Sequence, residues 1–299
     1  MNVVDSGELA VTTVTYPAGS LREKASVLTT VREPDRLLVF TDRTPFHPLD
    51  PLWPDQPADH GELRVGDHAF PVRDTLTAAR RDDGPLVVDD DIAARRDEPG
   101  VLFAVAHVLD PEAAPHLTPG TSVDLVVDAE RRNRLSAAHT ACHLLAYALN
   151  QVTHGLWRKE VPTDSRGHYD LDAATCVLTR HDVDGSLDHY RLGKSLRKKG
   201  FDTAAFLDRL PDVIGEVNAV LAGWIAADVA VRVEVTGPAL TDRRQWVCET
   251  PGGVATMPCG GTHVHHLAEI DSMTATATHD ADSGILEIRN RVVVAATVY

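Results

Sequence analysis

A segment with helical character and two regularly spaced histidines constrains this chain more than any other feature. Arg131–Leu145, RRNRLSAAHTACHLL, contains neither Pro nor Gly and carries apolar residues at helical spacing, which predicts a helix. His139 and His143 are four residues apart, so they lie on one face of that helix, one turn from each other. Cys142 points away from this face, and we expect it in the core.

A second motif, far along the chain, supplies a complementary pair of side chains. Met257–Val264, MPCGGTHV, places Cys259 and His263 on either side of a Gly-Gly pair that permits a tight turn. Either motif alone is weak evidence, because the chain has 15 His and a lone Cys is usually a small buried residue. Together they offer three imidazoles and a thiolate, the mixture of N and S ligands that Zn²⁺ prefers. The predicted Zn²⁺ ligands are His139, His143, Cys259 and His263.

The wording of the two motifs, H-T-A-C-H-L-L and C-G-G-T-H-V, resembles the alanyl-tRNA editing family. That family comprises AlaX-type proteins and the editing domain of alanyl-tRNA synthetase. The editing domain of threonyl-tRNA synthetases shares the metal spacing, but its Cys segment usually reads differently. The resemblance extends to Asp42–Gly61, DRTPFHPLDPLWPDQPADHG. The positions that match the family pattern there are Asp42, Thr44, Phe46, Pro48, Gln56, Pro57, Asp59 and Gly61.

Two departures from the family pattern fall in the same upstream segment. His47 stands where the family usually has Tyr, and Leu49–Asp55 replaces a run of glycines. Because glycines allow a backbone to approach a ligand closely, we expect a rebuilt pocket wall here. These departures therefore affect the prediction of which amino acid side chain is bound more than the prediction of the reaction.

Composition favours a globular protein, and its charge is unevenly distributed. The net charge is −15, and residues 1–130 hold 11 Lys and Arg against 24 Asp and Glu. Residues 131–299 hold 18 against 20, so they are almost balanced. Arg191–Lys199, RLGKSLRKK, is the most basic stretch and could contact tRNA phosphates, although a solvated surface explains it equally well. The candidate tRNA-binding residues are Arg191, Lys194, Arg197, Lys198 and Lys199.

Nothing in the sequence predicts a membrane or secreted protein. No apolar run reaches the roughly 18 residues that a membrane helix needs, and the N-terminus lacks the features of a signal peptide. The four Cys are too few and too dispersed for a disulfide framework. We therefore expect a cytoplasmic protein that binds neither membrane nor DNA.

Periodicity divides the chain into a β-rich part and a mixed part, with a boundary expected near Asp128. Short apolar segments separated by Pro, Gly and Asp predict strands at 9–16, 27–31, 36–41, 63–65, 68–73, 86–88, 102–109 and 122–127. They favour a small β-barrel domain over residues 1–128, which the resemblance also implies. Residues 129–299 are predicted to form an α+β editing domain with the zinc site. Its expected elements are helices at 131–152 and 202–228, the latter broken at Pro211, and strands at 175–180, 188–192, 231–235, 273–279, 285–289 and 292–298.

The resemblance implies a zinc-dependent aminoacyl-tRNA deacylase, an ester hydrolase that corrects misacylated tRNA. Its partner would be aminoacylated tRNA, tRNA-Ala or tRNA-Thr, and its amino acid small and serine- or threonine-like. Fluorothreonyl-tRNA deacylase is one specialised relative of this type. No segment resembles an aminoacylation core, so we expect a free-standing protein that edits in trans. Thr44 and Gln56, carried over from matching family positions, are the candidate catalytic residues.

The chemistry leaves alternatives open. Four protein ligands would close a tetrahedral zinc site, which is typical of structural zinc, and H-T-A-C-H lacks the general base of H-E-x-x-H enzymes. A non-catalytic aminoacyl-tRNA-binding module with structural zinc is therefore a second hypothesis. A metal hydrolase of small esters or amides is a third.

Overall fold

The structure is a computed structural model that describes residues 3–4, 8–51, 54–82, 84–89, 92 and 94–296. Leu52 and Trp53 of the changed pocket segment lie outside the described residues, as do residues 297 and 298 of the last expected strand. The chain forms two compact units. The first comprises Met1–Arg132, Val235–Arg244 and Gly260–Thr262, and the second comprises Asn133–Glu234, Gln245–Cys259 and His263–Tyr299. The domain boundary at residue 128 stays a prediction, because this grouping does not test whether either part folds alone.

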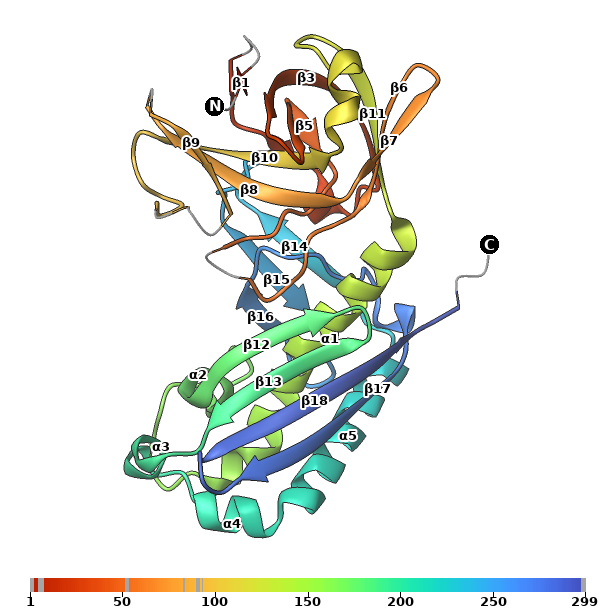
Figure 1. Cartoon of the computed structure of the whole chain (residues 1–299). Coiled ribbons are helices and arrows are strands. Elements are labelled where there is room, and N and C mark those ends of the chain that lie inside the picture. Colours follow the sequence, from red (N-terminus) through yellow and green to blue (C-terminus); the bar gives the residue numbers. More distant parts are fainter. Residues whose placement is uncertain are drawn as a thin grey trace. The chain divides into compact units, whose positions relative to one another are not determined.

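In its described residues the first unit is built mainly from strands, with short 3-10 helices between some of them (Figure 1). Its sheets are antiparallel except where β2 pairs with β5. The strands are β1 Val3–Val4, β2 Thr13–Val14, β3 Arg22–Arg32, β4 Leu37–Thr41, β5 Arg43–Thr44, β6 Gly61–Val65, β7 His68–Val72, β8 Asp74–Arg81, β9 Leu86–Val88, β10 Val101–Leu109 and β11 Ser122–Val127. The 3-10 helices are η1 Tyr16–Ala18 and η3 Pro111–His116.

The long strand β3 joins two halves of one bent sheet. Arg22–Ser26 pair with β11, whereas Val27–Arg32 pair with β4, and the register shifts between Val27 and Thr29. Such a bulge bends a strand and lets it change direction within a sheet. The order of the path is β7-β6-β11-β3-β4-β10-β8-β9, with β1 added beside β3.

The expected N-terminal small barrel is not shown by this topology. Closure would require β7 and β9, the two ends of the path, to pair, and no such pairing occurs among the described strands. The sheet bends at β3 and so encloses a core without closing on itself. Sequence pattern finds the strands, but closure depends on pairing between distant edges, which local pattern does not encode.

Strand β4 shows why the first unit has two apolar clusters. All five of its residues, LLVFT, are buried, so both faces of the strand are covered. Leu37 and Val39 contribute to one cluster, and Leu38 and Phe40 contribute to the other. Because side chains alternate between the faces of a strand, a continuous apolar run is typical of a strand covered on both sides.

The second unit is an α+β arrangement around a four-stranded antiparallel sheet with the order β12-β13-β18-β17. A smaller sheet has the order β14-β15-β16. The strands are β12 Cys176–Asp182, β13 Gly185–Arg191, β14 Val231–Val235, β15 Arg244–Cys248, β16 Ala255–Pro258, β17 Ile270–Asp280 and β18 Ile285–Val294. The helices are α1 Ala129–Thr153, η4 His154–Leu156, α2 Leu171–Thr175, α3 Lys194–Lys199, α4 Thr203–Asp208, α5 Leu210–Ala226 and η5 Leu267–Glu269.

Helices α1 and α5 cover one face of the larger sheet (Figure 1). Along β18 the buried residues Leu286, Ile288, Asn290 and Val292 alternate with more exposed ones, so a single face is turned toward the core. That face, α1 and α5 share one large apolar cluster. Helix α1 is buried almost continuously from Leu135 to Asn150, and this fixes the helix that carries both predicted histidine ligands.

The predicted helices are close to those observed, with one change. The helix expected at 131–152 is α1. The helix expected at 202–228 is divided at Arg209 rather than at Pro211. Pro211 lies in the first turn of α5, where its missing N–H leaves no hydrogen bond unmade. Asp202 begins α4 by accepting a hydrogen bond from the Ala205 amide, as a capping residue does.

Several elements were not predicted from the sequence. They include β1, β5, β8, β15, β16, α2 and α3, and the last two expected strands form the single strand β18. The Ala-Ala-Arg-Arg end of β8 has weak strand propensity and is held by pairing to β10. None of the helices in the described part of the chain is long and apolar enough to span a membrane.

Candidate metal centre

Four side chains from α1 and from the segment after β16 converge within the second unit. The ligand atoms of His139, His143, Cys259 and His263 all lie within 4.8 Å of one another. Cys259 Sγ is 3.3 Å from His139 Nε2 and 3.2 Å from His263 Nε2. The structure therefore brings together all four residues that the sequence predicted as ligands, and this group could hold a metal ion.

Burial prepares His143 to act as a ligand. Its removal from water lowers the pKa of the imidazole to about 3, with His181 contributing in the same direction. The ring is therefore neutral at pH 7. Its Nε2 atom is buried and has no hydrogen-bond partner among the described residues. A neutral imidazole nitrogen left without a partner fits a metal ion, because metal ligation uses a deprotonated ring nitrogen.

Thr140 orients the ring of His263. The Thr140 hydroxyl donates to the Ser136 carbonyl at 2.8 Å, so its oxygen accepts from its other neighbours. Those neighbours are His263 Nδ1, at 3.1 Å, and the Val264 amide, at 3.2 Å. In neutral His263 the proton is therefore on Nδ1, and the Nε2 lone pair is available on the side of Cys259. A second hydrogen bond that fixes a ligand's tautomer is typical of metal-binding histidines.

Two further aromatic rings lie against the ligands. The ring of Trp246, on β15, is 5.0 Å from that of His143 and 6.0 Å from that of His263, measured between centroids. The ring of His181, on β12, is 4.5 Å from that of His139. Trp246 is fully buried and His181 nearly so. Two buried aromatic rings therefore pack against the candidate ligands.

Cysteine and histidine residues close to the motifs lie elsewhere. Cys142 is buried, and its Sγ contacts Asp188 Oδ1 at 3.6 Å, outside the ligand group. This confirms the expectation that it points away from the histidine face. His265 and His266 are exposed, and their backbone amides both donate to Glu269. Neither belongs to the group of candidate ligands.

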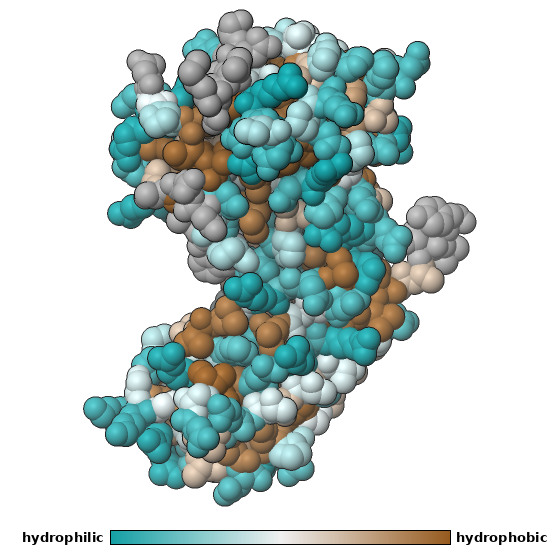
Figure 2. All heavy atoms as spheres, viewed as in Figure 1, coloured by the Kyte–Doolittle hydropathy of each residue, from teal (hydrophilic) through white to brown (hydrophobic). Residues whose placement is uncertain are grey.

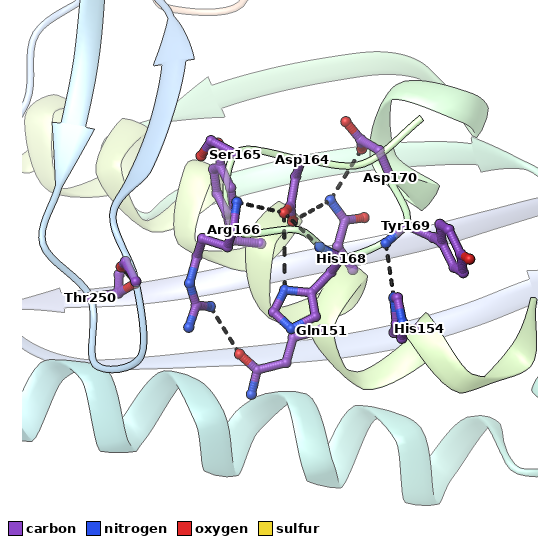
Figure 3. Close-up of polar contacts among 12 residues, drawn as sticks. Gln151, His154, Asp164, Ser165, Arg166, His168, Tyr169, Asp170 and Thr250 are labelled. Carbon is purple, nitrogen blue, oxygen red and sulfur yellow. Dashed lines mark hydrogen bonds and ion pairs between the residues drawn. The ribbon is translucent and has the colours of Figure 1, made fainter. Parts of the chain in front are cut away.

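A loop after α1 holds the hairpin that leads to Cys259 (Figure 3). Asp164 folds the loop by accepting from the backbone amides of Arg166 and His168. The Arg166 guanidinium then donates to Gln151 Oε1 on α1 and to the Pro251 carbonyl in the β15–β16 turn, both at 2.9 Å. Arg166 also lies 4.7 Å from the ring centroid of Trp224 on α5. One side chain thus connects two helices and the hairpin turn.

A second set of contacts fixes strand β16 itself. The Thr256 amide donates to Ser165 Oγ at 2.8 Å, and the Tyr147 hydroxyl donates to the Thr256 carbonyl at 2.6 Å. Tyr147 is one turn along α1 from His143. Because Cys259 follows β16 directly, these bonds hold the thiol in register with the histidines of α1.

Thr44, in the first unit, is fully buried and bound to a histidine that the sequence did not single out. His107 Nδ1 lies 3.0 Å from the Val39 carbonyl, so Nδ1 carries the proton. Burial lowers the pKa of His107 to about 4, opposed by the bond to Val39, and the ring is neutral at pH 7. Its Nε2 therefore accepts from the Thr44 hydroxyl at 2.8 Å, and the Phe46 amide donates to the same Thr44 oxygen. Because its proton is already donated to His107, Thr44 Oγ1 can only accept a hydrogen bond from a further partner.

Gln56 is also buried in the first unit, where it binds the tripeptide between the two ligands Cys259 and His263. Its Oε1 accepts from the Thr262 amide at 3.0 Å, and its Nε2 donates to Thr262 Oγ1 at 2.9 Å. Because Thr262 directly precedes His263, this pair of bonds restricts the turn that presents the ligand.

Asp59 has a structural role in the first unit. It forms a buried ion pair with Arg132, whose side chain is 4% exposed, and accepts from the His47 amide at 2.6 Å. Burial, with Arg132 and two other arginines adding, lowers the pKa of His47 to about 3. His47 replaces the usual Tyr as a neutral ring packed edge-on against Tyr16. At Gly61 a Cβ atom would lie 2.1 Å from the Val126 carbonyl, so only glycine fits.

The five cations of the predicted tRNA contact lie on and beside the short helix α3. Arg191, Lys194, Arg197, Lys198 and Lys199 are all exposed. None of them forms an ion pair within the described part of the chain. Lys159 adds a sixth cation, because its Nζ donates to the Lys198 carbonyl. Hydrophilic side chains project where α3 lies (Figure 2).

Sequence reasoning missed Thr140, His107, Trp246 and His181. Thr140 lies inside the H-T-A-C-H motif, and its position one residue after His139 was a usable signal. The other three come from strands with no motif around them, and only the tertiary structure brings them to their partners.

Parts of several alanine–tRNA ligases are similar to this chain. The enzyme of Akkermansia muciniphila is 34% identical over 128 residues, 43% of this chain and 11% of that protein. That of Chlorobaculum tepidum is 26% identical over 263 residues, 85% of this chain and 25% of that protein. That of Methanothermobacter thermautotrophicus is 26% identical over 190 residues, 62% of this chain and 18% of that protein.

The chain thus spans at most a quarter of the length of these relatives. No model of a known protein family matches it. The chain is therefore similar to one segment of these ligases, and the activity of the whole enzymes is not assigned to it.

Proposed function

We propose that this protein is a zinc-dependent aminoacyl-tRNA deacylase. It would remove a small serine- or threonine-like amino acid, fluorothreonine being one candidate, from a misacylated tRNA. The observation that carries the proposal is the convergence of His139, His143, Cys259 and His263. These residues belong to motifs that resemble the alanyl-tRNA editing domain. The similarity to segments of alanine–tRNA ligases supports the same interpretation.

Zinc fits the donor atoms better than other common ions. Three imidazole nitrogens and one thiolate suit Zn²⁺, whereas Mg²⁺ and Ca²⁺ prefer oxygen. Tetrahedral Zn–N and Zn–S bonds place neighbouring donor atoms about 3.3–3.8 Å apart. The distances from Cys259 Sγ to His139 Nε2 and His263 Nε2, 3.3 and 3.2 Å, are at and just below the lower end of this range. When bound, Zn²⁺ can polarise an ester carbonyl or acidify a water molecule.

The reaction is hydrolysis of the ester between the amino acid and the terminal adenosine. The oxygen of one water bonds to the carbonyl carbon, the bond from that carbon to the 2′- or 3′-oxygen of the ribose breaks, and a proton from the water goes to the departing oxygen. The products are the free amino acid and uncharged tRNA. The chain must therefore hold the ester, exclude competing groups and place charge-stabilising donors around the carbonyl oxygen.

Thr44 is the proposed residue that recognises the amino acid side chain. Its hydroxyl proton is donated to His107, so its oxygen can accept from a hydroxyl on the substrate. Serine and threonine carry such a donor and alanine does not. A site built to bind a hydroxyl can reject a substrate that lacks one by several orders of magnitude.

The other proposed site residues act at a distance from the ester. Gln56 would support catalysis by restricting the Thr262 turn rather than by contacting the substrate. The exposed cations of α3 would position the tRNA backbone without reading its sequence. Binding through such phosphate contacts weakens steeply as salt rises.

A non-catalytic aminoacyl-tRNA-binding module is the second candidate, and one observation favours it. The group supplies four protein ligands, which is the number that closes a tetrahedral site. Hydrolysis at such a site would need one ligand to exchange or the coordination to expand.

The two candidates are separated by assaying a panel of charged tRNAs. Zinc-loaded protein would be mixed with Ala, Gly, Ser, Thr and fluorothreonine on tRNA-Ala and tRNA-Thr, and the released amino acid measured. We expect selective release of a hydroxyl amino acid, and loss of release with retained tRNA binding in His143→Ala. Binding of tRNA without release of any amino acid would support the binding module instead.

A further inference from the structure

Trp246 is a wall of the metal centre that the four ligands do not account for. It occupies the centre of β15 and pairs with Met257 of β16. Because directly paired residues of an antiparallel hairpin share a face, Trp246 and Met257 lie on the same face, and Cys259 comes directly after β16. Its ring lies against the rings of His143 and His263, at 5.0 and 6.0 Å. It is 0% exposed and belongs to the large apolar cluster of the second unit.

The indole N–H of Trp246 has no hydrogen-bond acceptor among the described residues. Buried indole N–H groups normally find one, because an unpaired buried donor is unfavourable. His143 Nε2, in the adjoining ring, also has no described partner. A donor and an acceptor that lack partners thus occur in two rings in contact. A bound ligand that carries an oxygen atom would satisfy the donor.

We propose that Trp246 is a further catalytic residue, whose indole N–H binds the carbonyl oxygen of the ester. This inference rests on the deacylase function proposed above. Negative charge develops on that oxygen as water adds to the carbonyl carbon. A fixed donor in a water-excluded site stabilises such charge far better than one in water. Indole suits the role because it only donates and does not titrate in the accessible pH range.

A second tryptophan provides an internal control. Trp157 is also buried, and its indole N–H likewise has no described acceptor. Its ring packs against Phe201 at 5.0 Å and Tyr169 at 6.1 Å, and no ring contact joins it to the four ligands in the described structure. Trp157 and Trp246 therefore share burial and an unpaired donor, and differ in whether they touch the metal centre.

The test compares Trp246→Phe with Trp157→Phe. Each change keeps an aromatic ring and removes one N–H group. We expect Trp246→Phe to lower kcat by about 100-fold with little change in KM, the size typical of losing one oxyanion donor. Zn²⁺ affinity, measured by competition with a chelator, should stay within about twofold, as expected if the residue does not hold the metal. Trp157→Phe should leave both quantities near those of the unchanged protein.

A binding measurement gives a readout that does not need turnover. The probe is 3′-deoxy-3′-(serylamino)adenosine, an amide that keeps the carbonyl oxygen but resists hydrolysis. In an NMR spectrum, the indole N–H resonance of Trp246 is the one that disappears in the Trp246→Phe variant. Addition of the probe should shift this resonance and should leave that of Trp157 in place.

Three results would overturn the proposal. They are a wild-type rate in Trp246→Phe, an equal loss of rate in Trp157→Phe, and loss of Zn²⁺ from Trp246→Phe, which would make the residue structural. If the unchanged protein releases no amino acid from any tRNA, the deacylase function itself fails. The binding measurement decides separately. If the probe does not shift the Trp246 N–H resonance, the proposed role of this N–H group is wrong, whether or not the protein releases amino acid.

Discussion

At the scale of single residues, the metal centre depends on groups that fix the ligands as much as on the ligands. His263 presents Nε2 because Thr140 accepts the proton on Nδ1, and Thr140 accepts because its own proton goes to Ser136. Thr44 is an acceptor for the same kind of reason, since His107 takes its proton. The convergence of the four candidate ligands could be predicted from motif spacing. Their partners could not, because His107 is 63 residues from Thr44 and lies in an ordinary strand.

Thr140→Val tests the support of His263. The change removes the acceptor for His263 Nδ1–H and for the Val264 amide while keeping the shape of the side chain. We expect metal affinity, measured by chelator competition, to fall about 10- to 100-fold. Thr140→Ser keeps the hydroxyl and should bind metal almost as the unchanged protein does. Equal affinity in the two variants would show that the hydroxyl does not orient the ligand.

His107→Gln tests the buried state of His107 through pH. Because the folded pKa is about 4 and the unfolded value is about 6.5, only the unfolded chain gains this proton between those values. Stability attributable to His107 is therefore complete above pH 6.5 and is lost as pH falls toward 4.

Glutamine can donate to Val39 and accept from Thr44, but it does not titrate. Lowering the pH from 7 to 5 should reduce the free energy of unfolding of the original protein relative to the variant by about 2 kcal/mol. Denaturant unfolding at several pH values measures this difference. A difference that does not change with pH would mean that folding leaves the pKa of His107 unchanged.

At the scale of elements, the ligands are held by a helix and a hairpin that are tied to each other. Helix α1 was predictable, because a long segment without Pro or Gly and with helical periodicity has few alternatives. The hairpin β15–β16 was not, since its strands are short and are stabilised by contacts with Tyr147, Ser165 and Arg166. Local propensity carries no record of such tertiary contacts.

Gln56→Leu tests the turn between Cys259 and His263. It removes one acceptor and one donor that bind Thr262 while keeping a buried side chain of similar size. We expect a loss of about 1–3 kcal/mol in stability for the broken buried bonds, and weaker metal binding. Gln56→Glu retains the acceptor for the Thr262 amide, so its stability and metal affinity should lie between those of Gln56→Leu and the original protein. If Gln56→Leu has the metal affinity and stability of the original protein, the hydrogen bonds from Gln56 to Thr262 do not restrict the turn.

At the scale of the whole molecule, charge and topology differ in how far the sequence reveals them. The separation between an acidic first part and a nearly balanced remainder is a property of the sequence and needs no structure. The α+β character of the second unit follows from its periodicity. The open path of the first sheet depends on which distant strands pair, and the sequence pattern predicted a closed barrel instead.

Exposed cations of α3 should give the salt dependence of tRNA binding. Removing one cation that neutralises a phosphate should reduce the slope of log affinity against log salt by about one. Replacing Arg197 and Lys198 by Gln should therefore flatten the slope by up to about two. Replacing Arg64 and Arg289, which are exposed but paired with Glu62 and Glu287, is the matched control. Equal slopes in both variants would place the tRNA elsewhere.

Zinc-dependent deacylation is tested best by the single-turnover rate of amino acid release, measured as a function of bound zinc. Protein stripped of metal would be reloaded in steps and mixed with tRNA carrying the amino acid selected in the panel. We predict a release rate proportional to zinc occupancy, with tRNA affinity almost unchanged across the series. Release at full rate without metal, or tRNA binding with no release at full occupancy, would show the proposed function to be wrong.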